Sequence, residues 1–117
     1  MRGVFCLLVL SIGVLAHAAD SLSVEGRKID YLIASIEMSR DIQFIRNGIA
    51  YDAKHAADHL RVKLRNAGPR VVTAEDFIRL CASVSSVSGI PYQVRFPDGR
   101  VVSSEAYLRQ KLAELDR

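Results

Sequence analysis

Asn47-Gly48 stands between two short apolar segments, and it limits this chain to a fold that contains a tight β-hairpin. Both residues tolerate the positive φ of a type I′ turn, which makes the pair the strongest short-range hairpin signal. The flanking segments, 42–46 and 49–51, contain Ile, Phe and Tyr, which favour strands. Asp52 follows directly and is a preferred residue at a helix N-cap. The sequence therefore predicts a hairpin that passes straight into a helix.

Two helices are predicted around this hairpin. The one after Asp52 extends to about Asn66 and ends at Gly68-Pro69. Its apolar side is rich in alanine, which allows close packing against a neighbour, and consists of Ala53, Ala56, Ala57, Leu60 and Leu64. The helix before the hairpin runs from about Val24 to Met38, with Ser23 as its N-cap. Its apolar residues recur at i, i+3, i+4 and i+7, namely Ile29, Leu32, Ile33 and Ile36.

The second half of the chain repeats the order of helix, hairpin and helix. Thr73 opens a third helix with acidic residues in its first turn. The apolar side of this helix is predicted to include Phe77, Ile78, Leu80, Cys81 and Val84. Segments 92–96 and 100–102 flank Pro97-Asp98-Gly99 and form a second hairpin. Ser103 or Ser104 then caps a final helix whose apolar seam is Leu108, Leu112 and Leu115.

This order predicts the α+β class, with four helices and two β-hairpins. The halves also echo each other locally, because segment 59–64 resembles segment 107–112. Leucines four apart with Lys and Arg are ordinary in amphipathic helices, so the echo is weak evidence for duplication. It does favour one small antiparallel sheet with helices packed on one face.

The N-terminal residues predict export. A positive charge at Arg2 precedes an apolar run of about a dozen residues, and Ala16-His17-Ala18 has small residues where signal peptidase cleaves. The run is too short to span a membrane, which takes about 20 residues. We therefore expect residues 1–18 to be a signal peptide and residues 19–117 to form a single small domain.

Charge and cysteine content exclude several classes. The net charge of +3 falls to +2 without Arg2, and acidic and basic residues are interspersed, so no nucleic-acid partner is predicted. Removal of Cys6 leaves Cys81 alone in an oxidising compartment, which excludes an internal disulfide. Cys81 falls on an apolar helix face, so a buried, inert thiol is favoured over a reactive one.

Three ordered motifs carry a resemblance to a known family. They are Phe44-Ile45-Arg46-Asn47-Gly48 with Tyr51, His59-Leu60 and Lys63; Thr73-Ala74-Glu75-Asp76-Phe77-Ile78; and Ser85-Ser86-Val87-Ser88-Gly89-Ile90-Pro91-Tyr92 followed by Phe96-Pro97-Asp98-Gly99. The chain resembles the YfeK-like family of small secreted proteobacterial proteins, whose function is uncharacterised. The resemblance implies a periplasmic location in a Gram-negative cell, and it implies no activity.

Two histidines have a spacing that suits a metal. His55 and His59 are four residues apart, and segment 55–59 has the form of an inverted zinc-protease motif with Asp58 in place of glutamate. Asp58 points away from the histidine flank and no third ligand is evident. We therefore expect solvated or locally hydrogen-bonded histidines, with neither a metal nor a cofactor.

His59 and Lys63 leave two interpretations open. A cation beside an imidazole can hold an anionic group, with Arg46 from the hairpin as a bidentate partner. Alternatively, His59 is a border histidine bonded to a loop, and Lys63 lies over apolar surface.

The serine-rich segment also has two interpretations. Ser85, Ser86 and Ser88 can satisfy backbone groups where the helix unwinds, with Gly89 supplying an unusual φ, and this interpretation is favoured. A nucleophilic serine would need a base, and His59 is the candidate. The chain has no Gly-x-Ser-x-Gly elbow.

These observations favour a non-catalytic binding or interaction module of the periplasm that recognises a protein, a peptide or a cell-envelope component. The predicted binding residues are Arg46, Asn47, Tyr51, His59, Lys63, Ser85, Ser86, Ser88 and Tyr92. The alternative is a small envelope hydrolase that uses His59 with a serine of the Ser85–Ser88 loop. The chain is expected to be a monomer or a weak homodimer, and Tyr31 and Met38 are the candidate dimer contacts.

Overall fold

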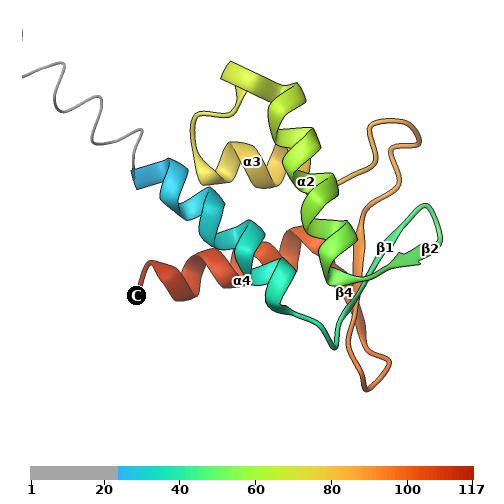
Figure 1. The fold of residues 1–117 in the computed structure, drawn as a ribbon. Helices are drawn as coiled ribbons and strands as arrows, with labels where there is room; N and C mark the ends of the chain where they lie inside the picture. The colour runs from blue at the N-terminus through green and yellow to red at the C-terminus, as the bar shows by residue number, and fades with distance from the viewer. Residues whose placement is uncertain (1–23) are drawn as a thin grey trace, which may run out of the picture.

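The computed structural model describes residues 24–117, which form four helices and one four-stranded antiparallel sheet (Figure 1). The elements are a helix over residues 24–38, β1 (Gln43–Arg46), β2 (Ile49–Tyr51), α2 (Ala53–Ala67), a short 3-10 helix η1 (Gly68–Arg70), α3 (Ala74–Cys81), β3 (Gln93–Arg95), β4 (Val101–Ser103) and α4 (Ser104–Leu115). The predicted α+β class and element order are confirmed. The predicted signal peptide and the Ser23 cap lie outside the described residues.

The local signals of the first half act as the sequence predicts. Asn47 and Gly48 adopt φ values of 51° and 78°, so both central turn residues are left-handed. The Asp52 carboxylate accepts the backbone N–H of His55 at 2.8 Å and caps α2. Gly68, with a φ of 54°, ends the helix and donates its N–H to the carbonyl of Leu64.

In the second half both predicted caps form, and two side chains that were predicted on apolar helix faces are exposed. Thr73 and Asp76 form a reciprocal capping box at the start of α3, and Ser103 caps α4. Val84 was predicted on the buried side of α3, and this is wrong: the helix ends at Cys81, and Val84 is 42% exposed and bridges to Pro91. Leu115, in the last turn of α4, is also exposed rather than part of the seam.

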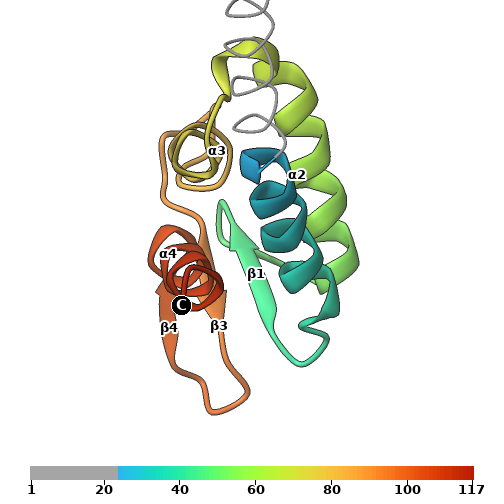
Figure 2. The same cartoon turned by 90° about the vertical axis from the view of Figure 1, so that its left-hand side faces the viewer.

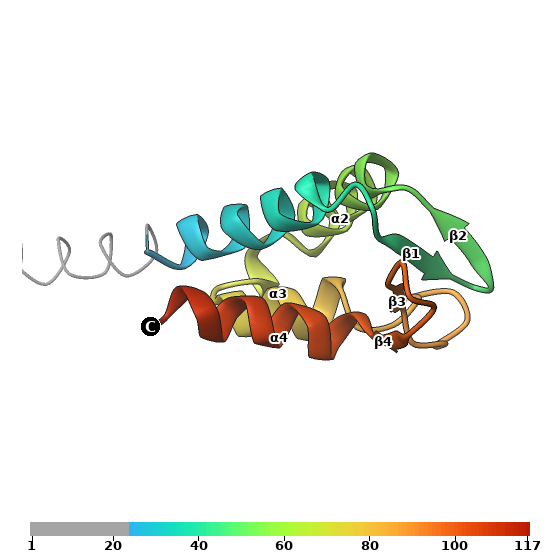
Figure 3. The same cartoon turned by 90° about the horizontal axis from the view of Figure 1, so that it is seen from below.

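The two hairpins join into one sheet through their first strands, in the order β2-β1-β3-β4. Phe44 lies opposite both Tyr51 and Val94, and Val94 lies opposite Val102. These side chains face the helices, because directly opposed residues share one face of a sheet. Figure 2 shows α2 beside β1 and α4 beside the second hairpin, and Figure 3 shows the helices gathered on one side of the strands.

The strand order gives the domain an approximate two-fold symmetry, which exchanges β1 with β3 and β2 with β4. Tyr51, opposite Phe44, immediately precedes the N-cap Asp52; Val102, opposite Val94, immediately precedes the N-cap Ser103. Position Asp52 is therefore equivalent to Ser103.

Counting onward from the two caps, Ala57 is equivalent to Leu108, and both are fully buried. The sequence echo instead aligns His59 with Tyr107. The caps make His59 equivalent to Gln110, so the echo is three residues out of register with the fold.

The core lies between the sheet and the helices. Its largest fully buried side chains are Phe77, Leu32, Ile36, Ile78, Leu108, Val94 and Cys81. The prediction of a buried Cys81 is confirmed, and burial raises the pKa of its thiol. The thiol therefore stays protonated and packs as a small apolar group.

The outer face of the N-terminal helix, over residues 24–38, is accessible. Met38 is 79% exposed, and Tyr31 is also exposed. A dimer through these side chains remains a prediction. None of the helices in the described part of the chain combines the length and apolarity that crossing a membrane requires.

Candidate functional site

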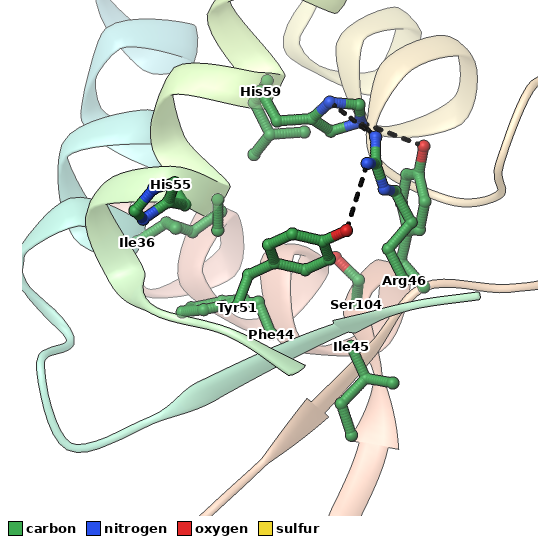
Figure 4. A pocket seen from close by; sticks show the side chains of 11 residues that line it. Ile36, Phe44, Ile45, Arg46, Tyr51, His55, His59 and Ser104 are labelled. Carbon is green, nitrogen blue, oxygen red and sulfur yellow. Dashed lines mark hydrogen bonds between the residues drawn. The ribbon is translucent and has the colours of Figure 1, made fainter. Parts of the chain in front are cut away.

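A pocket of about 240 Å³ lies between α2 and the helix-facing side of the first hairpin (Figure 4). Its apolar lining consists of Ile36, Phe44, Ile45, Ala56 and Leu60. Its polar lining consists of Arg46, Tyr51, His55, His59, Tyr92 and Ser104. The pocket thus combines apolar walls with a hydrogen-bonded group of four side chains, namely Arg46, Tyr51, His59 and Tyr92.

Arg46 is the centre of the polar group. It is the last residue of β1 and shares the helix-facing side of the sheet with Phe44, so its guanidinium extends toward α2. Its Nη1 lies 3.0 Å from His59 Nδ1, and its Nη2 donates to Tyr51 Oη at 3.3 Å. The guanidinium carbon also lies 5.2 Å from the centre of the Tyr51 ring. Figure 4 shows these three side chains turned toward one another.

Tyr92 extends the group to the second half of the chain. Its hydroxyl lies 3.2 Å from His59 Nε2 and accepts a hydrogen bond from Lys63 Nζ at 3.1 Å. Lys63 Nζ also donates to the carbonyl of Val84 at 3.2 Å. We call Arg46, Tyr51, His59, Lys63 and Tyr92 the cationic cluster.

The hydrogen bonds favour an uncharged His59 ring. Arg46 Nη1 lies 3.0 Å from His59 Nδ1 and 3.3 Å from Nε2, and a guanidinium has only donors, so at least one ring nitrogen accepts and carries no proton. His59 Nε2 also lies 3.2 Å from the Tyr92 hydroxyl, where either atom can donate. Protonation of both ring nitrogens would place a donor against the guanidinium. The cluster is therefore built around a neutral imidazole.

The cationic cluster has no internal counter-charge. Within residues 24–117, neither Arg46 nor Lys63 forms an ion pair with a carboxylate, whereas Arg61 and Arg109 do. Burial lowers the pKa of His59 below its ordinary value, and the charges of Arg46 and Lys63 lower it further. Two cations thus flank a half-buried neutral ring.

This lowered pKa predicts a pH dependence of stability. Unfolded His59 takes up a proton below about pH 6.5, while folded His59 resists it, so the unfolded state binds more protons. The free energy of unfolding should therefore fall as pH decreases from about 7 through the unfolded pKa, until pH drops below the folded pKa. The His59→Gln variant should lack this component.

Urea unfolding midpoints at pH 7.5 and pH 5.0 check the expectation for both proteins. Because other groups titrate in this range, the quantity of interest is the wild-type change minus the variant change. An identical change in both proteins would contradict the role assigned to His59.

The tip of the first hairpin lies against the serine-rich segment. Asn47 Nδ2 donates to Ser85 Oγ at 3.4 Å, and Ser88 Oγ donates to Asn47 Oδ1. Ser85 is buried, and its hydroxyl also accepts the N–H groups of Val87 and Ser88. Ser88 Oγ accepts the N–H of Ile90, and Gly89 has a φ of 73°. The predicted backbone-satisfying role is confirmed for Ser85 and Ser88.

The contacts of His59 and His55 bear on two hypotheses from the sequence, a serine hydrolase and a metal site. The His59 ring contacts Arg46 and Tyr92, and among the described residues it forms no hydrogen bond to a serine. His55 Nδ1 instead bonds Asp52 at 2.7 Å. The described residues contain no group of three or more His, Cys, Asp and Glu side chains placed to hold a metal ion.

The structure brings most of the predicted binding residues into two adjacent groups. Arg46, Tyr51, His59, Lys63 and Tyr92 form the cationic cluster, while Asn47, Ser85 and Ser88 join the hairpin tip to the loop. Ser86 is exposed and belongs to neither hydrogen-bonded group. Sequence reasoning missed the apolar walls and Ser104. The alanine-rich seam of α2 was a signal for the cavity, since Ala56 leaves space in its lining.

The two-fold symmetry places a second pocket of about 260 Å³ in the other half of the domain. At the positions of Arg46, Tyr51, His55, Ala56 and His59, its lining has Phe96, Val102, Ala106, Tyr107 and Gln110. Its Lys111 is paired with Glu114 at 3.9 Å. The same corner of the fold thus forms without the cationic cluster.

The fold and site define a small α+β domain with a pocket bordered by the cationic cluster. Residues 23–116 match a model for a family of unknown function, DUF5329, and the chain belongs to this family. It is 36% identical over 92 residues to the uncharacterized protein YfeK of Salmonella typhimurium strain LT2, a match that covers 79% of this chain and 77% of YfeK. The resemblance to the YfeK-like family is therefore confirmed. No solved structure matches this chain.

Proposed function

We propose that this protein is a non-catalytic binding module of the periplasm, which recognises an acidic group on a protein, a peptide or a cell-envelope component. The observation that carries the proposal is the cationic cluster without a carboxylate partner in the described chain. An acidic ligand group supplies the charge that Arg46 and Lys63 lack.

Electrostatics support an anion over a neutral ligand. Burial is the main cause of the lowered pKa of His59, and Arg46 and Lys63 add to it through like-charge repulsion. An anion at the cluster relieves this repulsion, and a guanidinium offers paired donors in the geometry of a carboxylate. The hairpin tip at Asn47 and the Ser85–Ser88 loop extend the same surface.

Capture from periplasmic extract tests the proposal. The immobilised protein is expected to retain a component at low salt, and Arg46→Ala should reduce its recovery at least tenfold. Arg95→Ala is the matched control, because Arg95 lies exposed in the same sheet and bonds Gln43 on the opposite face. Equal recovery by the wild type and Arg46→Ala would contradict the proposal.

The hydrolase alternative has a separate measurement. A fluorophosphonate probe labels an activated serine, so the non-catalytic proposal predicts no labelling that depends on His59. Labelling of the wild type that disappears in both His59→Ala and Ser86→Ala would favour the hydrolase instead.

A further inference from the structure

We propose that the pocket between α2 and the first hairpin takes a short apolar group that carries a carboxylate, with the carboxylate held at Arg46. Such chemistry occurs at the end of a peptide whose last residue is apolar, and in a short-chain fatty acid. This inference rests on the proposed function and adds the class of ligand.

Pocket size limits the ligand. Pockets for drug-sized molecules begin at about 300 Å³, and this one measures about 240 Å³. The space therefore suits one apolar side chain or a short acyl chain. Larger parts of a ligand would remain outside the pocket.

The distribution of polar side chains around the pocket limits the ligand further. The walls from Ile36, Phe44 and Leu60 offer no hydrogen bonds from their side chains. Among the described residues of the lining, the only Arg or Lys is at one end of the pocket, where Arg46 Nη2 and the Tyr51 hydroxyl lie 3.3 Å apart. A ligand that satisfies both regions has an apolar body and one anionic head.

The identity of the cations favours a carboxylate as the head. Arg46 presents a planar fork that matches a carboxylate with two parallel hydrogen bonds. Lys63 is already bonded to Tyr92 and to the carbonyl of Val84. Arg46 also bonds His59 and Tyr51, but its guanidinium has five N–H donors where Lys63 has three, so Arg46 keeps more donors for the head.

The second pocket shows that the fold does not require this chemistry. At the position of Ala56 the other half has Tyr107, a buried ring that packs edge-on against Phe44. At the position of Arg46 it has Phe96. Packing alone is therefore compatible with aromatic side chains at both positions, and the first pocket has the small residue and the cation instead.

Direct binding to the purified protein tests the ligand class. The probes are N-acetylalanyl-leucine, its C-terminal amide, hexanoate and hexanol, measured by NMR chemical-shift titration. Both acids are expected to bind, and the amide and the alcohol should bind at least tenfold more weakly. The ratio of peptide acid to hexanoate affinity distinguishes the two sources. Equal affinities for acid and amide, or no binding by either acid, would overturn the inference.

Two variants test separately how the carboxylate and the apolar part of the ligand contribute to binding. Arg46→Met keeps a long apolar stem without the charge, and should reduce acid binding at least tenfold. Ala56→Tyr copies the other half of the fold and fills the pocket, and should abolish binding of both acids. Ala50→Tyr is the control, because Ala50 is exposed, does not line the pocket, and lies opposite Ile45, whose side chain points away from the Arg46 side of the sheet (Figure 4). Unchanged binding in Arg46→Met would overturn the inference even if Ala56→Tyr does not fold.

The same variants separate this inference from the proposed function. Ala56→Tyr leaves the cationic cluster in place, so extract capture that depends on Arg46 but is insensitive to Ala56→Tyr would overturn the apolar ligand class alone. Capture that is insensitive to Arg46→Ala would remove the proposed function as well.

Discussion

Replacing Phe77 by alanine is expected to lower the free energy of unfolding by about 3–5 kcal/mol, as is typical of large-to-small changes in cores. Phe77 is 0% exposed and is the largest of the fully buried side chains. It lies in α3, which contacts both α2 and α4, so its ring supports the packing of both halves. Natural domains have a total of only about 5–15 kcal/mol. This one substitution therefore threatens the folded state.

Urea unfolding followed by circular dichroism measures the effect. Phe77→Leu should cost much less, because it keeps most of the buried volume. Val87→Ala is the surface control, since Val87 is 95% exposed and should change stability by less than about 0.5 kcal/mol. Similar losses in Phe77→Ala and Val87→Ala would show that Phe77 is not central to the core.

The second large effect is expected at Asn47, where alanine should cost about 2 kcal/mol. One part is conformational, because the left-handed backbone costs about 1–2 kcal/mol for ordinary L-residues and less for Asn. The other part is the loss of hydrogen bonds to Ser85 and Ser88, each worth about 0.5–1.5 kcal/mol. Since Ser85 is buried, its hydroxyl loses a partner that water replaces poorly.

A matched glycine variant separates the two parts. Asn47→Gly retains the left-handed turn and loses only the side-chain bonds, so it should cost about 1 kcal/mol. Asn66→Ala, at an exposed position of α2, controls for the loss of an amide side chain. Equal unfolding midpoints for the alanine and glycine variants would contradict the conformational contribution.

Local chemistry made much of the fold predictable. The turn at Asn47-Gly48 and the caps at Asp52, Thr73 and Ser103 act through neighbours within four residues, so a single sequence reveals them. The pairing of β1 with β3 joins segments about fifty residues apart. It depends on packing against the helices, and no local signal encodes it. The prediction that Val84 is buried was wrong because we extended the helix periodicity beyond Cys81. The helix ends there, and Ser83 bonds the backbone instead.

The sequence predicted which residues form the candidate site better than it predicted how they are arranged. Arg46, His59 and Lys63 were identified as a set, because helical spacing and the hairpin place them on one flank. The role of Tyr92, which bonds both His59 and Lys63, depends on the residue just before β3, in the other half of the domain. The alanine-rich seam of α2 was a signal for a cavity, but the size and lining of the pocket depend on which side chains stop short of one another, and a pattern of residue types does not reveal that.

The sheet order has a consequence for behaviour in a crowded compartment. Within residues 24–117 the two edge strands are β2 and β4, and each has only three residues. Each is followed at once by a helix, so little unpaired backbone is available as a template for another chain. We expect this arrangement to discourage edge-to-edge aggregation, and to let a domain without an internal disulfide stay dispersed at high concentration.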